Sequence, residues 1–187
     1  MQFTDPPPAA PNLRERAARL LMAATPFSQL GLEDALVVID AMEPAFVNVG
    51  TVLMEEGQTR DTDYMALLLE GDLRAESGAG VPGEEVVMSV LGPGHLIGEM
   101  GVLDGSPRSA TCVALSDLKL AVLPRDALMR LVDSHPAVAS RLLLAVCKGM
   151  SDRLRESNRR LRLLSQVSRA VQLELDAAHS INRRLLN

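Results

Sequence analysis

Two charged side chains in one short stretch of the chain could together bind a phosphorylated sugar. Arg108 carries a planar guanidinium whose paired N–H groups match phosphate oxygens. Glu99 would repel a phosphate, but its carboxylate accepts hydrogen bonds from sugar hydroxyls. Gly98 is expected to open a single helical turn that ends near Leu103, and the Asp-Gly-Ser-Pro sequence at 104–107 then reverses the chain. Since N–H groups at the start of a helical turn also attract anions, this stretch predicts a site for phosphate plus ribose.

The residues of this stretch also follow a known pattern, made of Gly98-Glu99-Met100, Leu103 and Pro107-Arg108-Ser109-Ala110-Thr111. It resembles the phosphate-binding cassette of the cyclic nucleotide-binding domain family. That family is a β-roll shared by bacterial catabolite activators, kinase regulatory subunits and cyclic-nucleotide-gated channels. The resemblance covers roughly residues 26–153 and extends upstream through residues at family-like spacing, namely Phe46, Gly50, Glu56, Gly57, Tyr64, Gly71 and Gly94.

The resemblance implies a small second messenger with a 3′,5′-cyclic phosphate as the ligand, and no other cofactor. The phosphate would bind Arg108 and the main-chain N–H groups of Ser109 and Ala110. The ribose 2′-hydroxyl would bind Glu99 and the backbone of Gly98. The first turns of a long C-terminal helix would cover the base.

Base recognition is where the sequence departs from the family pattern. Ser109 is typical of family members that bind cyclic AMP, whereas a threonine there is typical of cyclic GMP binders. Ile97 lies just before the cassette, where family residues help to hold the base, and Met100 lies within the cassette. Arg153 stands where the catabolite activator uses a threonine to hold adenine, and it could stack on a purine or bind a second phosphate. The resemblance therefore implies cyclic AMP first and a cyclic dinucleotide such as cyclic di-GMP second.

Three alternatives remain open from the residues alone. Arg108 could be a surface arginine that closes a β-turn, with Glu99 as its cap. The roll could be a ligand-free scaffold for protein contacts. The basic C-terminal segment could bind nucleic acid through phosphate contacts.

Composition and periodicity predict the elements that must position these side chains. The chain has 187 residues, is 47% hydrophobic and contains one Tyr, three Phe and no Trp, so its core must be aliphatic. We expect a flexible tail at 1–11, N-terminal helices within 12–44, a β-roll at 45–135 and a long helix at 136–187. The fold class is α+β, mainly β, an antiparallel β-roll or jelly roll. The expected strands are 45–49, 51–54, 64–70, 73–76, 85–91, 109–114 and 118–123, and the expected helices are 13–24, 32–42 and 124–132.

The segment after residue 136 is predicted to be helical to the end of the chain, with a hinge near 165–168 as the alternative. Residues 136–187 predict a homodimeric coiled coil, because two heptad positions are mostly apolar. One takes Leu143, Met150, Ser157, Leu164, Val171, Ala178 and Leu185, and the other takes Cys147, Leu154, Leu161, Ser168, Leu175 and Asn182. Residues 1–140 hold 9 basic and 20 acidic side chains, and residues 141–187 hold 10 basic and 4 acidic, so only the C-terminal segment is basic.

Several functional classes are not supported by the sequence. Transcription factors of the family continue into a winged helix-turn-helix; no such helix pair is visible after Asp152, so we expect no DNA binding by this chain alone. No metal-ligand spacing or catalytic triad motif is present, which predicts no metal and no enzyme activity. No signal peptide or membrane span is visible, and we expect a cytoplasmic sensor that signals through its C-terminal helix to a protein effector whose identity the sequence does not reveal.

Overall fold

The computed structural model describes residues 13–23, 30–78 and 85–185. The chain divides into two compact units, Met1–Val146 and Cys147–Asn187. The tail predicted at 1–11 lies outside the described residues. In chain order the elements are α1 (Leu13–Ala23), α2 (Leu32–Asp40), β1 (Glu43–Val47), β2 (Val52–Met54), β3 (Tyr64–Glu70), β4 (Leu73–Gly78), β5 (Glu85–Leu91), β6 (Leu96–Ile97), α3 (Glu99–Asp104), β7 (Thr111–Ala114), β8 (Leu118–Pro124), α4 (Arg125–Ser134) and α5 (Pro136–Leu185).

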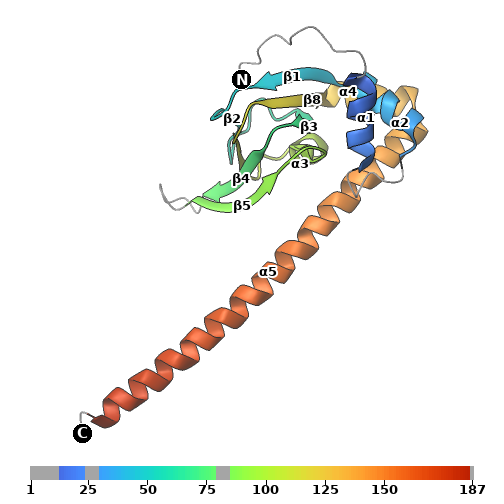
Figure 1. The fold of residues 1–187 in the computed structure, drawn as a ribbon. Helices are drawn as coiled ribbons and strands as arrows, with labels where there is room; N and C mark the ends of the chain where they lie inside the picture. Colours follow the sequence, from blue (N-terminus) through green and yellow to red (C-terminus); the bar gives the residue numbers. More distant parts are fainter. Residues whose placement is uncertain (1–12, 24–29, 79–84, 186–187) are drawn as a thin grey trace. The chain divides into compact units, whose positions relative to one another are not determined.

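The strands form two antiparallel four-stranded sheets that face each other. Their orders are β1-β8-β3-β6 and β2-β7-β4-β5. Figure 1 shows the strands curving around a common interior, with α1, α2 and α4 gathered at one end of the roll. The interior is filled by aliphatic side chains such as Leu53, Leu68, Leu73, Leu118 and Leu120. The predicted fold class, a mainly β roll with N-terminal helices and a long C-terminal helix, is confirmed.

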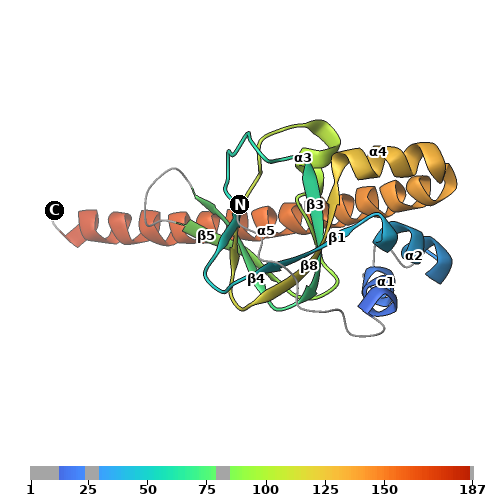
Figure 2. The same cartoon turned by 90° about the horizontal axis from the view of Figure 1, so that it is seen from above.

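β3 is the central strand that carries the chain to the candidate site. It pairs with β8 on one side and with β6 on the other. Ala66 and Leu68 point into the interior of the roll. Leu67 between them is equally buried, and α1 and α3 both contact this strand. Because both faces of β3 are covered, its sequence is continuously apolar rather than alternating. Figure 2 shows α3 next to β3.

Several strand boundaries differ from the sequence prediction, and one strand was not predicted. The strands expected at 51–54, 73–76, 109–114 and 118–123 are observed at Val52–Met54, Leu73–Gly78, Thr111–Ala114 and Leu118–Pro124. The first strand was expected at 45–49, but β1 spans Glu43–Val47 and includes Pro44. Proline lacks a donor, yet β1 is an edge strand that pairs only with β8, so the missing N–H is tolerated. The two-residue β6 was not predicted at all. Leu96 and Ile97 form this strand by pairing with Leu67 and Ala66 of β3. Two residues are too few to show a strand pattern in the sequence.

α5 is one continuous helix of 50 residues, so the predicted hinge near 165–168 is absent from it. Its first turns belong to the first compact unit, where Ala139, Leu142 and Val146 are buried. Within the described ranges, no helix combines the length and the apolar character needed to cross a bilayer.

Candidate ligand-binding site

The stretch predicted to bind phosphate and ribose folds as a tight helical turn between β6 and β7. Gly98 begins it in the left-handed conformation, with φ 75°, and Gly105 ends it with φ 71° and an N–H that donates to Gly101 O over 3.0 Å. The carboxylate of Asp104 accepts a 2.9 Å hydrogen bond from the main-chain N–H of Ser106, and this bond lowers the pKa of Asp104. These two bonds turn the chain back on itself and bring Arg108 beneath α3.

Main-chain bonds then anchor the returning segment. Arg108 N donates to Gln58 O over 3.0 Å, and Gly57 N donates to Arg108 O over 2.8 Å. The segment that connects β2 to β3 therefore holds the Arg108 backbone from the other side. The position of Arg108 is set by residues that lie about fifty positions earlier in the chain.

Glu99 and Arg108, the two charged residues of the prediction, are both buried. Glu99 is 2% exposed at the first position of α3, and Arg108 is 4% exposed. Arg108 is thus not the surface arginine of the alternative interpretation. Its Nη1 donates to Gly98 O over 3.0 Å, which ties the guanidinium to the residue directly before Glu99. The structure places the acid and the guanidinium at the same turn.

The guanidinium is surrounded by main-chain carbonyls. Besides the bond to Gly98, Nη1 donates to Tyr64 O over 3.1 Å, and Nη2 donates to Tyr64 O and Asp61 O, each over 3.2 Å. Nε is buried and has no hydrogen-bond partner among the described residues. Four donor contacts are therefore directed at the protein's own backbone.

Tyr64 contributes its ring as well as its carbonyl. The guanidinium carbon of Arg108 lies 4.6 Å from the centroid of the Tyr64 ring, which is cation–π geometry. The phenol hydroxyl donates to Leu53 O over 3.2 Å. Burial raises the pKa of Tyr64, and the neighbouring positive charge of Arg108 opposes that rise. Tyr64 thus bridges β2 and the guanidinium.

Two glycines leave the space that the guanidinium occupies. A Cβ built on Gly98 would lie 2.6 Å from Arg108 Nη1 and 2.7 Å from Met54 Cε. A Cβ on Gly101 would lie 3.5 Å from the same nitrogen and 3.2 Å from Thr62 O. At Gly98 the positive φ and the close approach both require glycine.

The remaining predicted site residues lie in different surroundings. Ile97 is buried, Ala110 is half-buried, and Ser109 and Met100 are exposed and contact each other, with Ser109 Oγ 3.5 Å from Met100 Sδ. None of the hydrogen bonds among the described residues takes up the main-chain N–H groups of Ser109 and Ala110. Arg153 belongs to the second compact unit.

Asp61 and Tyr64 were not predicted as site residues. Tyr64 was noted only for its family-like spacing, although as the single tyrosine it is a conspicuous residue. Asp61 has φ 52°, an uncommon left-handed conformation for a residue other than glycine, and its carbonyl accepts from Arg108. The polar, turn-rich sequence at 58–63 could have indicated a structured loop there, but not its role.

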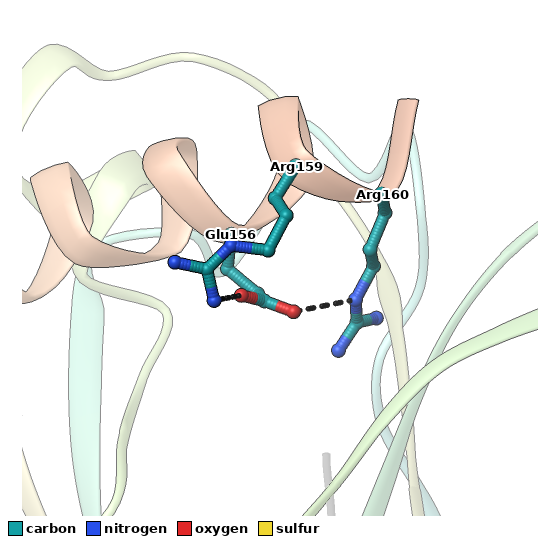
Figure 3. Close-up of polar contacts among 3 residues, drawn as sticks. All are labelled: Glu156, Arg159 and Arg160. Carbon is teal, nitrogen blue, oxygen red and sulfur yellow. Dashed lines mark hydrogen bonds and ion pairs between the residues drawn. The ribbon is translucent and has the colours of Figure 1, made fainter. Parts of the chain in front are cut away.

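The arginines of α5 are partly neutralised by acids on the same helix. Arg159 and Arg160 both contact Glu156, with N–O distances of 3.3 Å, as Figure 3 shows. Arg155 pairs with Asp152 over 2.7 Å. No cluster of three or more potential metal ligands is found in the ranges 13–23, 30–78 and 85–185. The observed charge pattern is that of a helix with internal ion pairs.

The chain is similar to known proteins over the roll. The family described as "cyclic nucleotide-binding domain" matches residues 46–135. The cyclic AMP receptor protein of Thermus thermophilus is 41% identical over 83 residues, which are 44% of this chain and 37% of that protein. More generally, the chain spans between 7% and 37% of the length of the first curated relatives that it matches.

Two solved structures extend the similarity to most of the chain. A cyclic nucleotide-binding domain from Methylobacillus flagellatus superposes with TM-score 0.69 and 29% identity, covering 79% of this chain and 81% of that one. The N-terminal domain of a transcriptional regulator from Streptomyces coelicolor superposes with TM-score 0.62 and 30% identity, covering 76% of this chain and 94% of that one. Together with the cassette sequence and the roll that positions it, these similarities establish that the chain belongs to the cyclic nucleotide-binding domain family.

Proposed function

We propose that this protein is a cyclic AMP sensor whose ligand binds at the α3 turn, with the ribose on Glu99 and the cyclic phosphate on Arg108 and the N–H groups of Ser109 and Ala110. The observation that carries the proposal is the burial of an acid and a guanidinium at one turn of a family roll. Buried charges are costly unless they are paired and hydrogen-bonded, so a fold that keeps both charges at one turn favours a functional role for them. A ligand with one anionic and one hydroxyl-bearing group would use both.

The choice of cyclic AMP rests on two further observations. Ser109, rather than threonine, follows Arg108, and the Thermus relative with 41% identity is a cyclic AMP receptor protein. A cyclic dinucleotide remains the second candidate ligand because of Arg153, which lies outside the roll. The internal ion pairs of the α5 arginines give no support to a nucleic-acid role.

The proposed output passes through α5 to a protein effector, and the proposed assembly is a homodimer through this helix. Leucine and valine side chains at the two heptad positions of the second unit are exposed in a single chain, namely Leu154, Leu161, Leu164 and Val171. A stripe of that length favours a second helix as its partner. We propose no enzymatic reaction.

Isothermal titration calorimetry with cyclic AMP, cyclic GMP and cyclic di-GMP tests the ligand proposal. The wild-type chain is expected to bind cyclic AMP most tightly. Glu99→Gln and Arg108→Gln should each weaken binding about 10- to 150-fold, the range expected for a lost hydrogen bond to a charged group. The matched control is Arg130→Gln, which removes an exposed arginine whose ion pair among the described residues is with Asp126 and should leave binding unchanged. If cyclic di-GMP binds more tightly than cyclic AMP, cyclic di-GMP becomes the proposed ligand. If no nucleotide gives a heat of binding, the sensor function is contradicted.

A further inference from the structure

The donors that a phosphate would need are already in use. Each terminal nitrogen of Arg108 can donate two hydrogen bonds, and each has two carbonyl acceptors at 3.0 to 3.2 Å. Only the Nε–H is left, and it is buried without a partner in the described part of the chain. In this position the guanidinium cannot present two parallel N–H groups to a phosphate.

The surroundings of the guanidinium hold it but do not neutralise it. Its acceptors are neutral carbonyls, its face lies on the Tyr64 ring, and none of the ion pairs found among the described residues includes Arg108. A buried cation without a counter-ion is costly, and hydrogen bonds to an anion are about twice as strong as bonds to neutral groups. A phosphate would therefore compete successfully for these donors, at the expense of the bonds that it replaces.

We propose that Tyr64 and the carbonyls of Asp61, Tyr64 and Gly98 form a latch that holds Arg108 away from the ligand, and that ligand binding must release it. This inference rests on the proposed function and names the regulation of the same site. Tyr64 is a positioning residue: it acts on the ligand through Arg108. The measured affinity is then the intrinsic affinity reduced by the fraction of molecules in which Arg108 is released.

Release also explains how occupation of the site reaches the rest of the roll. When the guanidinium leaves, the carbonyls of Asp61, Tyr64 and Gly98 lose their donors, and the space beside Gly98 and Gly101 loses its occupant. Unpaired carbonyls and an empty space are both unfavourable, so the 61–64 segment and the α3 turn must adjust. Tyr64 is the first residue of β3 and α3 contacts this strand, so these adjustments also change the start of β3.

The test compares two substitutions of Tyr64 by calorimetry with cyclic AMP. Tyr64→Leu removes the ring face and should tighten binding about 2- to 30-fold, the range of a cation–π contact from an exposed to a desolvated setting. Tyr64→Phe keeps the ring and loses only the hydroxyl that donates to Leu53 O, so this conservative variant should restore an affinity close to that of wild type. If Tyr64→Leu weakened binding instead, the Tyr64 ring would contribute general packing and would not hold Arg108 away from the ligand.

Nuclear magnetic resonance of the Arg108 Nε–H gives a second readout in the wild-type chain. Ring stacking should shift this proton upfield in the ligand-free protein, and saturation with cyclic AMP should remove the shift. Binding of cyclic AMP with the Arg108 signal unmoved, or equal or weaker binding by Tyr64→Leu, would overturn the latch and leave the proposed function standing. No binding by either wild type or Tyr64→Leu would overturn the proposed function itself.

Discussion

At the scale of single residues, the site is defined by where one guanidinium can place its donors. Arg108 is buried beneath α3 and is shared between the ring of Tyr64 and three carbonyls. Sequence patterns predicted that Arg108 and Glu99 lie at one turn. They could not predict that the Arg108 side chain points inward. This orientation depends on the space beside Gly98 and Gly101, which carry no side chain, and on the carbonyls of a loop that is distant in the sequence.

Tyr64 supplies a direct residue-scale prediction, since it is the only tyrosine and the chain has no tryptophan. Burial raises its pKa above the ordinary value, so a phenolate absorbance titration of the folded protein should give a pKa higher than about 10. A raised folded-state pKa means that the neutral ring's contribution to stability is fully present below about pH 10 and is lost as the pH rises through the folded-state pKa.

The charge of Arg108 should be visible in the same titration. Arg108→Met removes the positive charge that opposes the rise, so the pKa of Tyr64 should move further up. Arg130→Met, which removes an exposed arginine paired with Asp126, serves as the control and should leave the titration unchanged. Identical curves for wild type and Arg108→Met would show that the guanidinium does not lie on the ring in solution.

At the scale of elements, the structure depends on close approaches that only glycine permits. Gly71 makes the turn from β3 to β4 with φ 90°, and a Cβ there would overlap the main-chain oxygen of Asp117 and lie 2.7 Å from Leu118 Cδ2. Gly50 has a similar φ of 81°, but a Cβ there would meet nothing within 4 Å. Substitution of Gly50 therefore tests backbone strain alone, whereas substitution of Gly71 tests backbone strain together with steric overlap.

We expect Gly50→Ala to lower the free energy of unfolding by about 1–2 kcal/mol, the strain of a left-handed alanine. Gly71→Ala should lose the same amount and about 1–3 kcal/mol more from overpacking against β8. Urea denaturation followed by circular dichroism measures both values. Equal losses for the two variants would mean that the turn relaxes away from Asp117 without cost.

The elements themselves were predicted best where local patterns decide them. The continuous apolar run of β3 and the glycine-bounded β5 match the sequence prediction at both ends. β6 and the start of β1 did not, because pairing partners distant in sequence decide them: Ile97 pairs with Ala66, and Pro44 lies opposite Ala121. Short strands carry too few residues to show a period of their own.

At the scale of the whole molecule, the heptad stripe of the second unit predicts a dimer. Leu161 occupies a seam position and Leu163 does not, yet both are more than half exposed in the single chain, at 61% and 56%. Light scattering should give wild type and Leu163→Gln twice the chain mass of 20.1 kDa. Leu161→Gln should shift toward the monomer, because a buried amide at the seam costs free energy.

Two results would contradict that assembly. A wild-type chain that stays monomeric at micromolar concentration would remove the coiled coil. Equal dissociation of Leu161→Gln and Leu163→Gln would mean that the contact uses a different face of the helix.

The central claim is that Glu99 and Arg108 bind the two ends of a cyclic nucleotide at the α3 turn. Crystallographic difference density from crystals grown with cyclic AMP tests it most directly. The account predicts density for the ribose against the carboxylate of Glu99 and for the phosphate against a guanidinium that has left the carbonyls of Asp61 and Tyr64. An empty turn with Arg108 still bonded to those carbonyls, under conditions of saturating nucleotide, would contradict it.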